Sequence, residues 1–135
     1  TRVVQEKILG IGGVRLLRAL NVEPSVYHLN EGHSAFLTLE LAREFLRENA
    51  ESSFADAVDF VRQKCVFTTH TPVAAGNDTF PLDLIEACFD DTFIHNLKLS
   101  ENEFFALGRA NQADEQEWFG MTPLALRMAR SSNGV

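Results

Sequence analysis

Two short segments, each directly after a strand candidate, carry the side chains best suited to chemistry in this sequence. Glu31 and His33 follow the apolar residues 26–29, and His70 follows the apolar residues 66–69. In an open α/β sheet, ligands bind in the crevice beyond the carboxyl ends of the strands. If the two strands are near neighbours, these side chains converge on that crevice. A neutral imidazole donates one hydrogen bond and accepts another, which suits the hydroxyl groups of a sugar.

A simpler structural interpretation stays open for each of these residues. Glu31 and His33 could serve only as turn and helix-capping residues, and His70 could only pack after a buried strand. A metal site built from these three residues and Asp78 is a further alternative, since all four are common ligand types. No H-x-x-x-H pattern or similar rigid spacing supports it, so we expect no metal site. His28 lies within the first strand candidate and is predicted to have no catalytic role.

The glycine-rich stretch at residues 10–13 does not match a dinucleotide-binding motif. In a G-x-G-x-x-G pattern that starts at Gly10, the third glycine position is occupied by Arg15, and no strand candidate precedes it. These glycines are expected to interrupt a helical pattern, either by letting the helix bend or by letting another backbone approach closely.

Hydrophobic periodicity and capping residues predict the elements that must position the two segments. In chain order they are a helix at residues 2–9 that continues over 14–20, a strand at 25–29, a helix at 33–48, a helix after the Ser53-x-x-Asp56 capping box, a strand at 65–69, a helix after Pro81, a helix after the Ser100-x-x-Glu103 capping box, and a last helix at 122–130.

Strands that alternate with helices predict an α/β fold with a parallel sheet flanked by helices. Both strand candidates are short and mostly apolar, as in a sheet covered on both faces. Because two strands do not make a stable open sheet, either residues 93–97 form an overlooked strand or the sheet continues outside this chain. We expect the second, since the chain begins at Thr1 without an initiator Met and stops just after Asn133-Gly134, which we interpret as a helix end.

Composition narrows the class of protein. The 135 residues suit one domain, and 45% of them are hydrophobic. A net charge of −7, with no cluster of Lys or Arg, argues against nucleic acid as a partner. No apolar run has the length of a membrane span. Cys65 and Cys88 sit in apolar runs, which predicts reduced core residues of an intracellular protein.

Four blocks of this sequence resemble the α-glucan phosphorylases, the glycogen and starch phosphorylase family. They are residues 26–36 (VYHLNEGHSAF), 67–73 (FTTHTPV), 5–13 (QEKILGIGG) and 121–127 (MTPLALR), the last followed by NGV at 133–135. Their order and spacing fit along essentially the whole chain. The residues of these blocks are more similar to the short bacterial and archaeal branch of the family, because the animal enzymes have Asn-Asp-Thr-His-Pro where this chain has NEGHS.

The resemblance implies a two-domain glycosyltransferase of the GT-B type, with Rossmann-like parallel sheets and the active site between the domains. Residues 1–135 would form a single fragment, the later part of the N-terminal domain. The family transfers a terminal α-1,4-linked glucosyl unit of a glucan to inorganic phosphate and releases glucose 1-phosphate. Its cofactor, pyridoxal phosphate, is held by a Lys of the C-terminal domain, which this chain lacks. The resemblance therefore implies a cytoplasmic enzyme whose isolated 135-residue piece is inactive.

The resemblance also assigns roles to individual residues. His70 would be catalytic: its side chain would contact a hydroxyl of the glucosyl unit, and its backbone carbonyl would lie near the anomeric centre and stabilise positive charge there. Glu31, His33 and Thr71 would line the same pocket as substrate-binding residues. Two alternatives are a sugar-nucleotide transferase similar to glycogen or starch synthase, which the block around His70 disfavours, and a non-catalytic carbohydrate-binding module.

Overall fold

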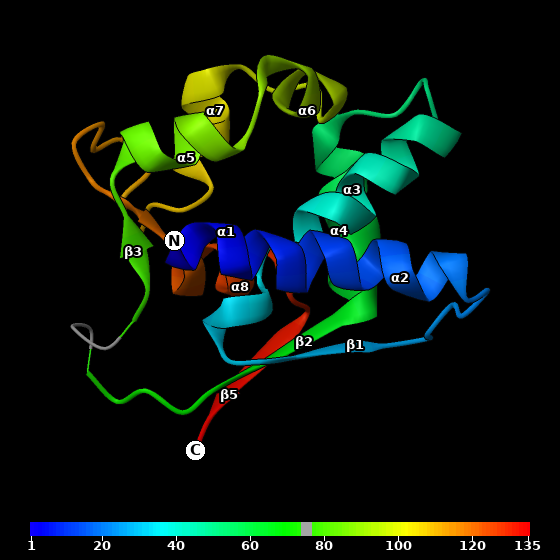
Figure 1. Cartoon of the computed structure of the whole chain (residues 1–135), viewed down its shortest axis with the longest axis horizontal. Helices are drawn as coiled ribbons and strands as arrows, with labels where there is room; N and C mark the ends of the chain where they lie inside the picture. Colours follow the sequence, from blue (N-terminus) through cyan, green and yellow to red (C-terminus); the bar gives the residue numbers. More distant parts are fainter. Residues whose placement is uncertain (74–76) are drawn as a thin grey trace.

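A computed structural model of the chain describes residues 1–73 and 77–135 (Figure 1). Its elements, in chain order, are α1 (Arg2–Lys7), a π-helical turn (Ile8–Gly12), α2 (Gly13–Ala19), β1 (Tyr27–Asn30), a 3₁₀ turn (Gly32–Ser34), α3 (Leu37–Glu48), α4 (Phe54–Lys64), β2 (Cys65–Thr69), β3 (Thr79–Phe80), α5 (Leu82–Cys88), α6 (Asp91–Asn96), α7 (Glu101–Ala106), β4 (Phe119–Gly120), α8 (Met121–Met128) and β5 (Ser131–Gly134). Both predicted capping boxes are present, at the starts of α4 and α7.

The main sheet has three parallel strands in the order β1-β2-β5, which confirms the predicted α/β fold with a parallel sheet. Its third strand was not predicted. Asn133-Gly134 was interpreted as a helix end, but both residues lie in β5 and pair with β2. Residues 93–97 were the alternative strand, and most of them lie in α6. The four residues of β5 are polar or Gly and exposed, so their pairing with β2 defines the strand and no hydrophobic pattern marks it.

Within residues 1–73 and 77–135, helices cover one face of this sheet and leave the other exposed, where two covered faces were expected (Figure 1). Along β1, Tyr27 and Leu29 are buried, whereas His28 and Asn30 point to the open face and are exposed. On that face the ring of His28 lies 2.9 Å from the hydroxyl of Thr68, which donates to the side-chain oxygen of Asn133 at 2.8 Å. A row of polar side chains therefore links the three strands.

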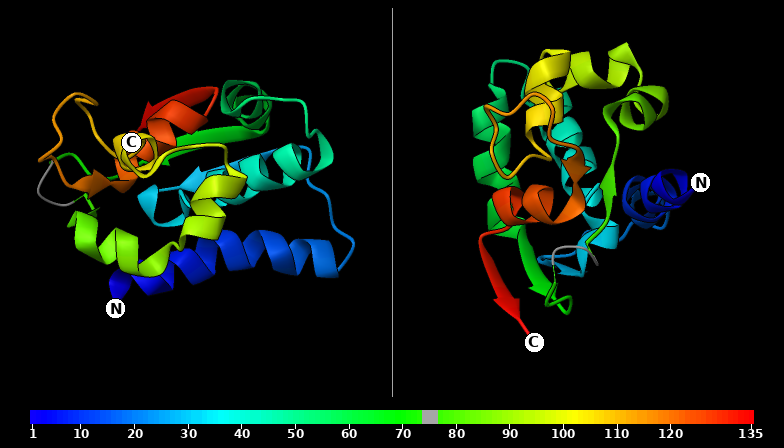
Figure 2. Two further views of the ribbon diagram at one scale, coloured as in Figure 1. Left: turned by 90° about the horizontal axis from the view of Figure 1, so that it is seen from above. Right: turned by 90° about the vertical axis from the view of Figure 1, so that its left-hand side faces the viewer.

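The N-terminal helix runs without a break from α1 through the π-helical turn into α2, as Figure 2 shows. The glycines coincide with the π-helical turn, so they interrupt the α-helical pattern as predicted without ending the helix, and the predicted close approach is confirmed. A Cβ atom added to Gly10 would lie 2.6 Å from the backbone nitrogen of Leu37. The helix thus crosses directly over the start of α3, and only Gly fits at the crossing.

This crossing yields a stability prediction. We expect Gly10→Ala to destabilise the fold by about 3 kcal/mol, because the new methyl group meets backbone rather than a side chain that could move. Gly13 is the matched control: it lies in the same helix, and a Cβ there meets nothing within 4 Å. We expect Gly13→Ala to stabilise the fold by about 0.5–1 kcal/mol, as Ala does in helix interiors. Urea unfolding of both variants measures the difference, and equal effects would contradict the crossing.

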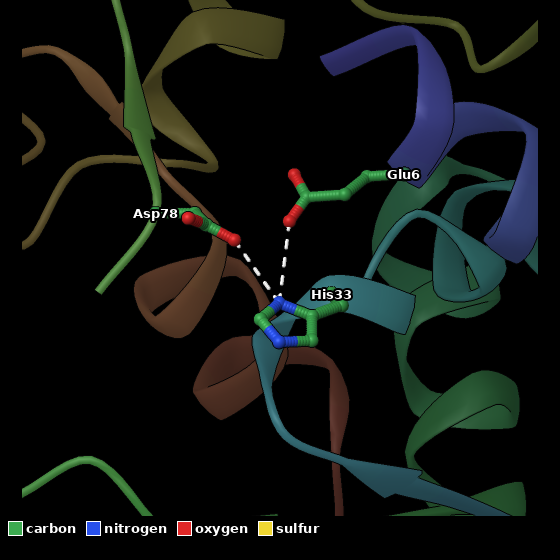
Figure 3. A group of neighbouring side chains, drawn as sticks. All are labelled: Glu6, His33 and Asp78. Atoms are coloured by element: carbon green, nitrogen blue, oxygen red, sulfur yellow. Dashed lines mark hydrogen bonds and ion pairs between the residues drawn. The ribbon is translucent and has the colours of Figure 1, made fainter. Parts of the chain in front are cut away.

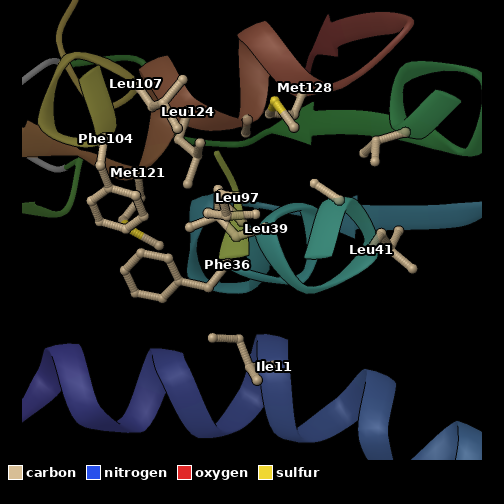
Figure 4. Packing of buried hydrophobic residues seen from close by; sticks show 14 of the residues in the cluster. Ile11, Phe36, Leu39, Leu41, Leu97, Phe104, Leu107, Met121, Leu124 and Met128 are labelled. Atoms are coloured by element: carbon tan, nitrogen blue, oxygen red, sulfur yellow. The ribbon is translucent and has the colours of Figure 1, made fainter. Parts of the chain in front are cut away.

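The core between the sheet and the outer helices is rich in phenylalanine. The ring of Phe36 lies 5.0 Å from that of Phe89 and 6.1 Å from that of Phe119, and Phe104 packs against both Phe89 and Phe119. Figure 4 shows Phe36 and Phe104 within this core. These four rings are essentially buried. They pack the residue just before α3, and with it the turn that carries His33, against the end of α5, α7 and β4. None of the helices in the described part of the chain is both long and apolar enough to cross a membrane.

Candidate functional site

The carboxyl ends of β1 and β2 bring Glu31 and His70 together, as their positions after the two strands predict. Asn30 is paired with Thr68 in the sheet, and the backbone N–H of Glu31 continues the pairing by donating to the carbonyl of Thr68 at 2.8 Å. Glu31 and His70 therefore leave adjacent strands at the same edge. This is the edge at which open α/β sheets bind ligands.

The carboxylate of Glu31 binds the turn that follows β2. Its Oε2 accepts hydrogen bonds from the backbone N–H of His70 at 2.7 Å and from the hydroxyl of Thr71 at 3.1 Å. Its Oε1 accepts from the hydroxyl of Thr69 and the backbone N–H of Gly32, both at 3.2 Å. An ionised carboxylate offers about four lone-pair sites, so these four donors fill them.

The ionisation of Glu31 follows from the same contacts. Partial burial disfavours the charged form, but the hydrogen bonds outweigh burial and lower the pKa of Glu31, with the bond from the His70 backbone as the largest contribution. Since each of these donors prefers a charged acceptor, the carboxylate is ionised at neutral pH. The link between the two strand ends therefore consists of charge-assisted hydrogen bonds.

Glu31 also has an unusual backbone conformation. Its φ of 84° and ψ of 166° lie in a region that is essentially restricted to Gly. Such a conformation costs about 1–3 kcal/mol and persists only where surrounding contacts enforce it. Here the carboxylate contacts and the pairing with β2 enforce it. Strain of this kind is concentrated at functional sites, which supports a role for this turn.

His70 is exposed at the sheet edge, with one ring nitrogen engaged. Its Nε2 lies 2.6 Å from the side-chain oxygen of Asn30, the last residue of β1. With that oxygen as acceptor, Nε2 carries the hydrogen, and in this tautomer Nδ1 is a hydrogen-bond acceptor. Asn30 was not among the predicted site residues, although its place beside Glu31 at the end of β1 is visible in the sequence.

His33 lies near the other predicted residues but has different partners. It sits in the 3₁₀ turn rather than in the first turn of the predicted α-helix. Its Nδ1 lies 3.0 Å from Oδ2 of Asp78 and 3.4 Å from Oε1 of Glu6 (Figure 3). A small pocket beside it is lined by Glu31, Gly32, His33, Thr71, Asn77, Asp78 and Thr122. It therefore brings together three of the predicted site residues, Glu31, His33 and Thr71, with Asp78, which was considered only for the metal alternative.

Glu6 is the residue of this region that sequence reasoning missed. It projects from α1 and is 4% exposed. Burial raises its pKa to about 9, with a further contribution from the neighbouring Asp78, while Arg2 acts in the opposite direction. The burial of Glu6 could have been inferred from its helical spacing. It lies between Val3 and Gly10 on the side of the helix that faces the core.

The raised pKa of Glu6 predicts a pH-dependent stability. Between the ordinary pKa of 4.5 and about 9, the folded state holds a proton that the unfolded state has lost. Stability from this group is therefore full below pH 4.5 and falls as pH rises, by up to about 1.4 kcal/mol per pH unit. We expect Glu6→Gln to remove this fall, so its stability relative to wild type increases from pH 5 to pH 9. Urea unfolding across that range measures it; a constant difference would mean that Glu6 is ionised throughout.

A larger hollow, of about 730 Å³, lies elsewhere, beside the first residue of β1. Several of its charged side chains form ion pairs with one another. Arg15 and Arg43 contact Glu40 at 3.1 and 2.6 Å, and Arg18 contacts Glu44 at 3.0 Å. These five charges are therefore compensated within the protein, and the hollow lies away from the strand ends, so the carboxyl edge of the sheet is the stronger candidate site.

Comparison with proteins of known function gives a consistent result. No family model matches the chain. A maltodextrin phosphorylase of Thermococcus litoralis is 42% identical over 134 residues, which cover 99% of this chain and 15% of that protein. A glycogen phosphorylase of Mycobacterium tuberculosis is 39% identical, over 99% of this chain and 16% of that protein. A glycogen phosphorylase of Aquifex aeolicus is 31% identical, over 99% and 19%.

The chain thus spans only 15% to 19% of the length of these relatives. The matched region nevertheless includes all four sequence blocks, since it covers nearly the whole chain. The resemblance drawn from those blocks is confirmed, and the chain is homologous to a segment of the glycogen and maltodextrin phosphorylases.

Proposed function

We propose that the protein carrying this chain is an α-1,4-glucan phosphorylase, which transfers a terminal α-1,4-linked glucosyl unit to inorganic phosphate and releases glucose 1-phosphate. The observation that carries the proposal is the turn after β2, where the carboxylate of Glu31 holds His70 at the carboxyl edge of the sheet. The relatives, a maltodextrin phosphorylase and two glycogen phosphorylases, support the same reaction class. The protein is proposed to be cytoplasmic, with glucan, phosphate and glucose 1-phosphate as its partners.

The proposed architecture is a GT-B enzyme in which residues 1–135 form the later part of the N-terminal Rossmann-like domain. The three-stranded parallel sheet supports it, because Rossmann-like domains are built on such sheets. The remainder of the polypeptide would supply the second domain and the other wall of the active site. Neither nucleic acid nor membrane is proposed as a partner, in keeping with the net charge of −7.

Pyridoxal phosphate is proposed as the cofactor of the whole protein, where its phosphate group supplies acid/base chemistry. The residues of this chain do not fit its attachment, which needs a Lys. Lys7 and Lys98 donate to backbone carbonyls, of Cys88 and of Ala50 and Ser52, and Lys64 stacks over a Phe ring. None of the three lysines belongs to the strand-end site. The attachment would therefore come from outside residues 1–135.

In the proposed reaction, the residues of this chain bind and orient the sugar. The Nδ1 nitrogen of His70 would accept a hydrogen bond from a hydroxyl of the glucosyl unit, and its carbonyl would face the positive charge that develops at the anomeric carbon. The carboxylate of Glu31 has its acceptor positions filled by protein donors, so we assign it to positioning His70 rather than to direct sugar contact. Thr71 and His33 would line the pocket beside it.

The test is a donor assay on the whole protein. Glucose 1-phosphate should form from maltodextrin and phosphate, and glucan should lengthen with glucose 1-phosphate but not with ADP-glucose. Elongation from ADP-glucose alone would establish the sugar-nucleotide transferase instead, and glucan binding without turnover would establish a carbohydrate-binding module.

The isolated 135-residue chain provides a second expected result. It should release no glucose 1-phosphate from maltodextrin, because the proposed cofactor attachment and the phosphate-binding residues lie outside it. A coupled assay for glucose 1-phosphate measures this, with the whole protein at equal concentration as the positive control. Measurable phosphorolysis by the short chain would show that residues 1–135 contain a complete active site.

A further inference from the structure

Three side chains from separate parts of the chain gather beside the strand-end site. Glu6 comes from α1, His33 from the 3₁₀ turn, and Asp78 directly precedes β3. One ligand atom from each lies within 4.8 Å of the other two (Figure 3). We propose that Glu6, His33 and Asp78 form a binding site for one divalent transition-metal ion of the Zn²⁺ type.

The distances suit such an ion. Zinc binds imidazole nitrogen and carboxylate oxygen at about 2.0–2.2 Å, which places neighbouring ligand atoms about 3–4 Å apart in a tetrahedral site. Nδ1 of His33 lies 3.0 Å from Oδ2 of Asp78 and 3.4 Å from Oε1 of Glu6. The side chains therefore converge on one point with only small movements needed.

The state of Glu6 points independently to a missing ligand. The residue is 4% exposed, and neither of its carboxyl oxygens has a hydrogen-bond partner within residues 1–73 and 77–135. Figure 3 shows this carboxyl group directed toward His33 and Asp78. A buried polar group without a partner is costly, and a bound cation would satisfy it.

The local charge also favours a cation. Arg2 is the positive group at this cluster: its Nε lies 3.1 Å from Oδ1 of Asp78 and 3.8 Å from Oε1 of Glu6. Its side chain is 57% exposed, so it can turn into solvent when an ion binds.

The ligand types select the class of ion. Carboxylates alone favour Mg²⁺ or Ca²⁺, whereas an imidazole ligand favours Zn²⁺ and its neighbours in the first transition series. Three protein ligands leave a fourth position open, and the small pocket that His33 and Asp78 share with Thr71 and Thr122 borders it. The metal site considered from the sequence combined His33 and Asp78 with Glu31 and His70. In the structure the carboxylate of Glu31 instead accepts a hydrogen bond from the backbone of His70. The third ligand proposed here is Glu6, which lies on α1 and was not a candidate ligand in the sequence.

Calorimetric titration of the EDTA-treated whole protein with ZnCl₂ tests the site without an activity measurement. At pH 7.5 we expect one saturable site that binds about one Zn²⁺ per chain. Glu6→Gln and Asp78→Asn should each weaken binding by at least about 10²-fold, more than the loss typical of an outer-shell partner. Glu101→Gln, an exposed carboxylate on α7, is the matched control and should bind like wild type.

A second measurement keeps the proposal testable if one of these variants folds poorly. The visible spectrum of bound Co²⁺ reports its ligands directly, and His33→Asn should remove the imidazole contribution while leaving both carboxylates in place. Mg²⁺ at the same concentration should not compete. The proposal would be overturned if Glu6→Gln left zinc binding unchanged, or if the wild-type protein showed no saturable zinc binding.

Discussion

Replacing His70 with alanine in the whole protein is expected to lower kcat and kcat/KM for phosphorolysis together, by about 10²-fold or more. The reason is that its proposed hydrogen bond to the glucosyl unit strengthens as the ring flattens toward an oxocarbenium ion. An interaction made mainly in the transition state lowers both constants when it is removed. The magnitude is that of one preorganised hydrogen-bonding group in a closed site.

His28→Ala is the matched control for this experiment. His28 is a second exposed histidine of the same sheet, and its ring contacts the hydroxyl of Thr68 rather than the strand-end site. We expect the activity of the His28→Ala enzyme to remain near that of wild type. Thermal melts confirm that both variants fold. Near-normal kcat in a folded His70→Ala enzyme would reduce His70 to a structural residue and support the simpler interpretation of its segment.

Glu31→Ala is expected to lower kcat by about 10²-fold with a much smaller change in KM. The substitution removes the acceptor for the backbone N–H of His70 and for the hydroxyls of Thr69 and Thr71, so the turn loses its defined position. A displacement of about 1 Å in a positioned group is sufficient for a rate loss of this size. Steady-state kinetics on the whole protein separates the two constants.

Two further substitutions distinguish positioning from direct substrate contact. Glu31→Gln keeps one oxygen that can accept from His70 but presents an NH₂ group to the donors on its other side, so we expect a loss of about 10-fold. Glu31→Asp keeps the charge but shortens the reach, and we expect a similar loss. If KM for maltodextrin rose while kcat stayed constant in these variants, Glu31 would contact the sugar directly and the positioning role would be wrong.

Much of the local structure could be predicted from the sequence, because local interactions determine it. The capping boxes at Ser53 and Ser100 mark helix starts through bonds that span three residues. The second strand was predicted at residues 65–69 and extends over Cys65–Thr69. The adjacency of Glu31 and His70 also followed from the sequence, since parallel strands place their carboxyl ends at one edge.

The tertiary structure alone decided the features that depend on residues far apart in the chain. Strand β5 has no apolar side chain, so only its backbone pairing with β2 identifies it. Glu6 and Asp78 are 72 positions apart in the chain, and their meeting depends on how α1 packs against the turn after β1. The raised pKa of Glu6 is likewise a property of its surroundings, because burial and a neighbouring charge exist only once the chain has folded.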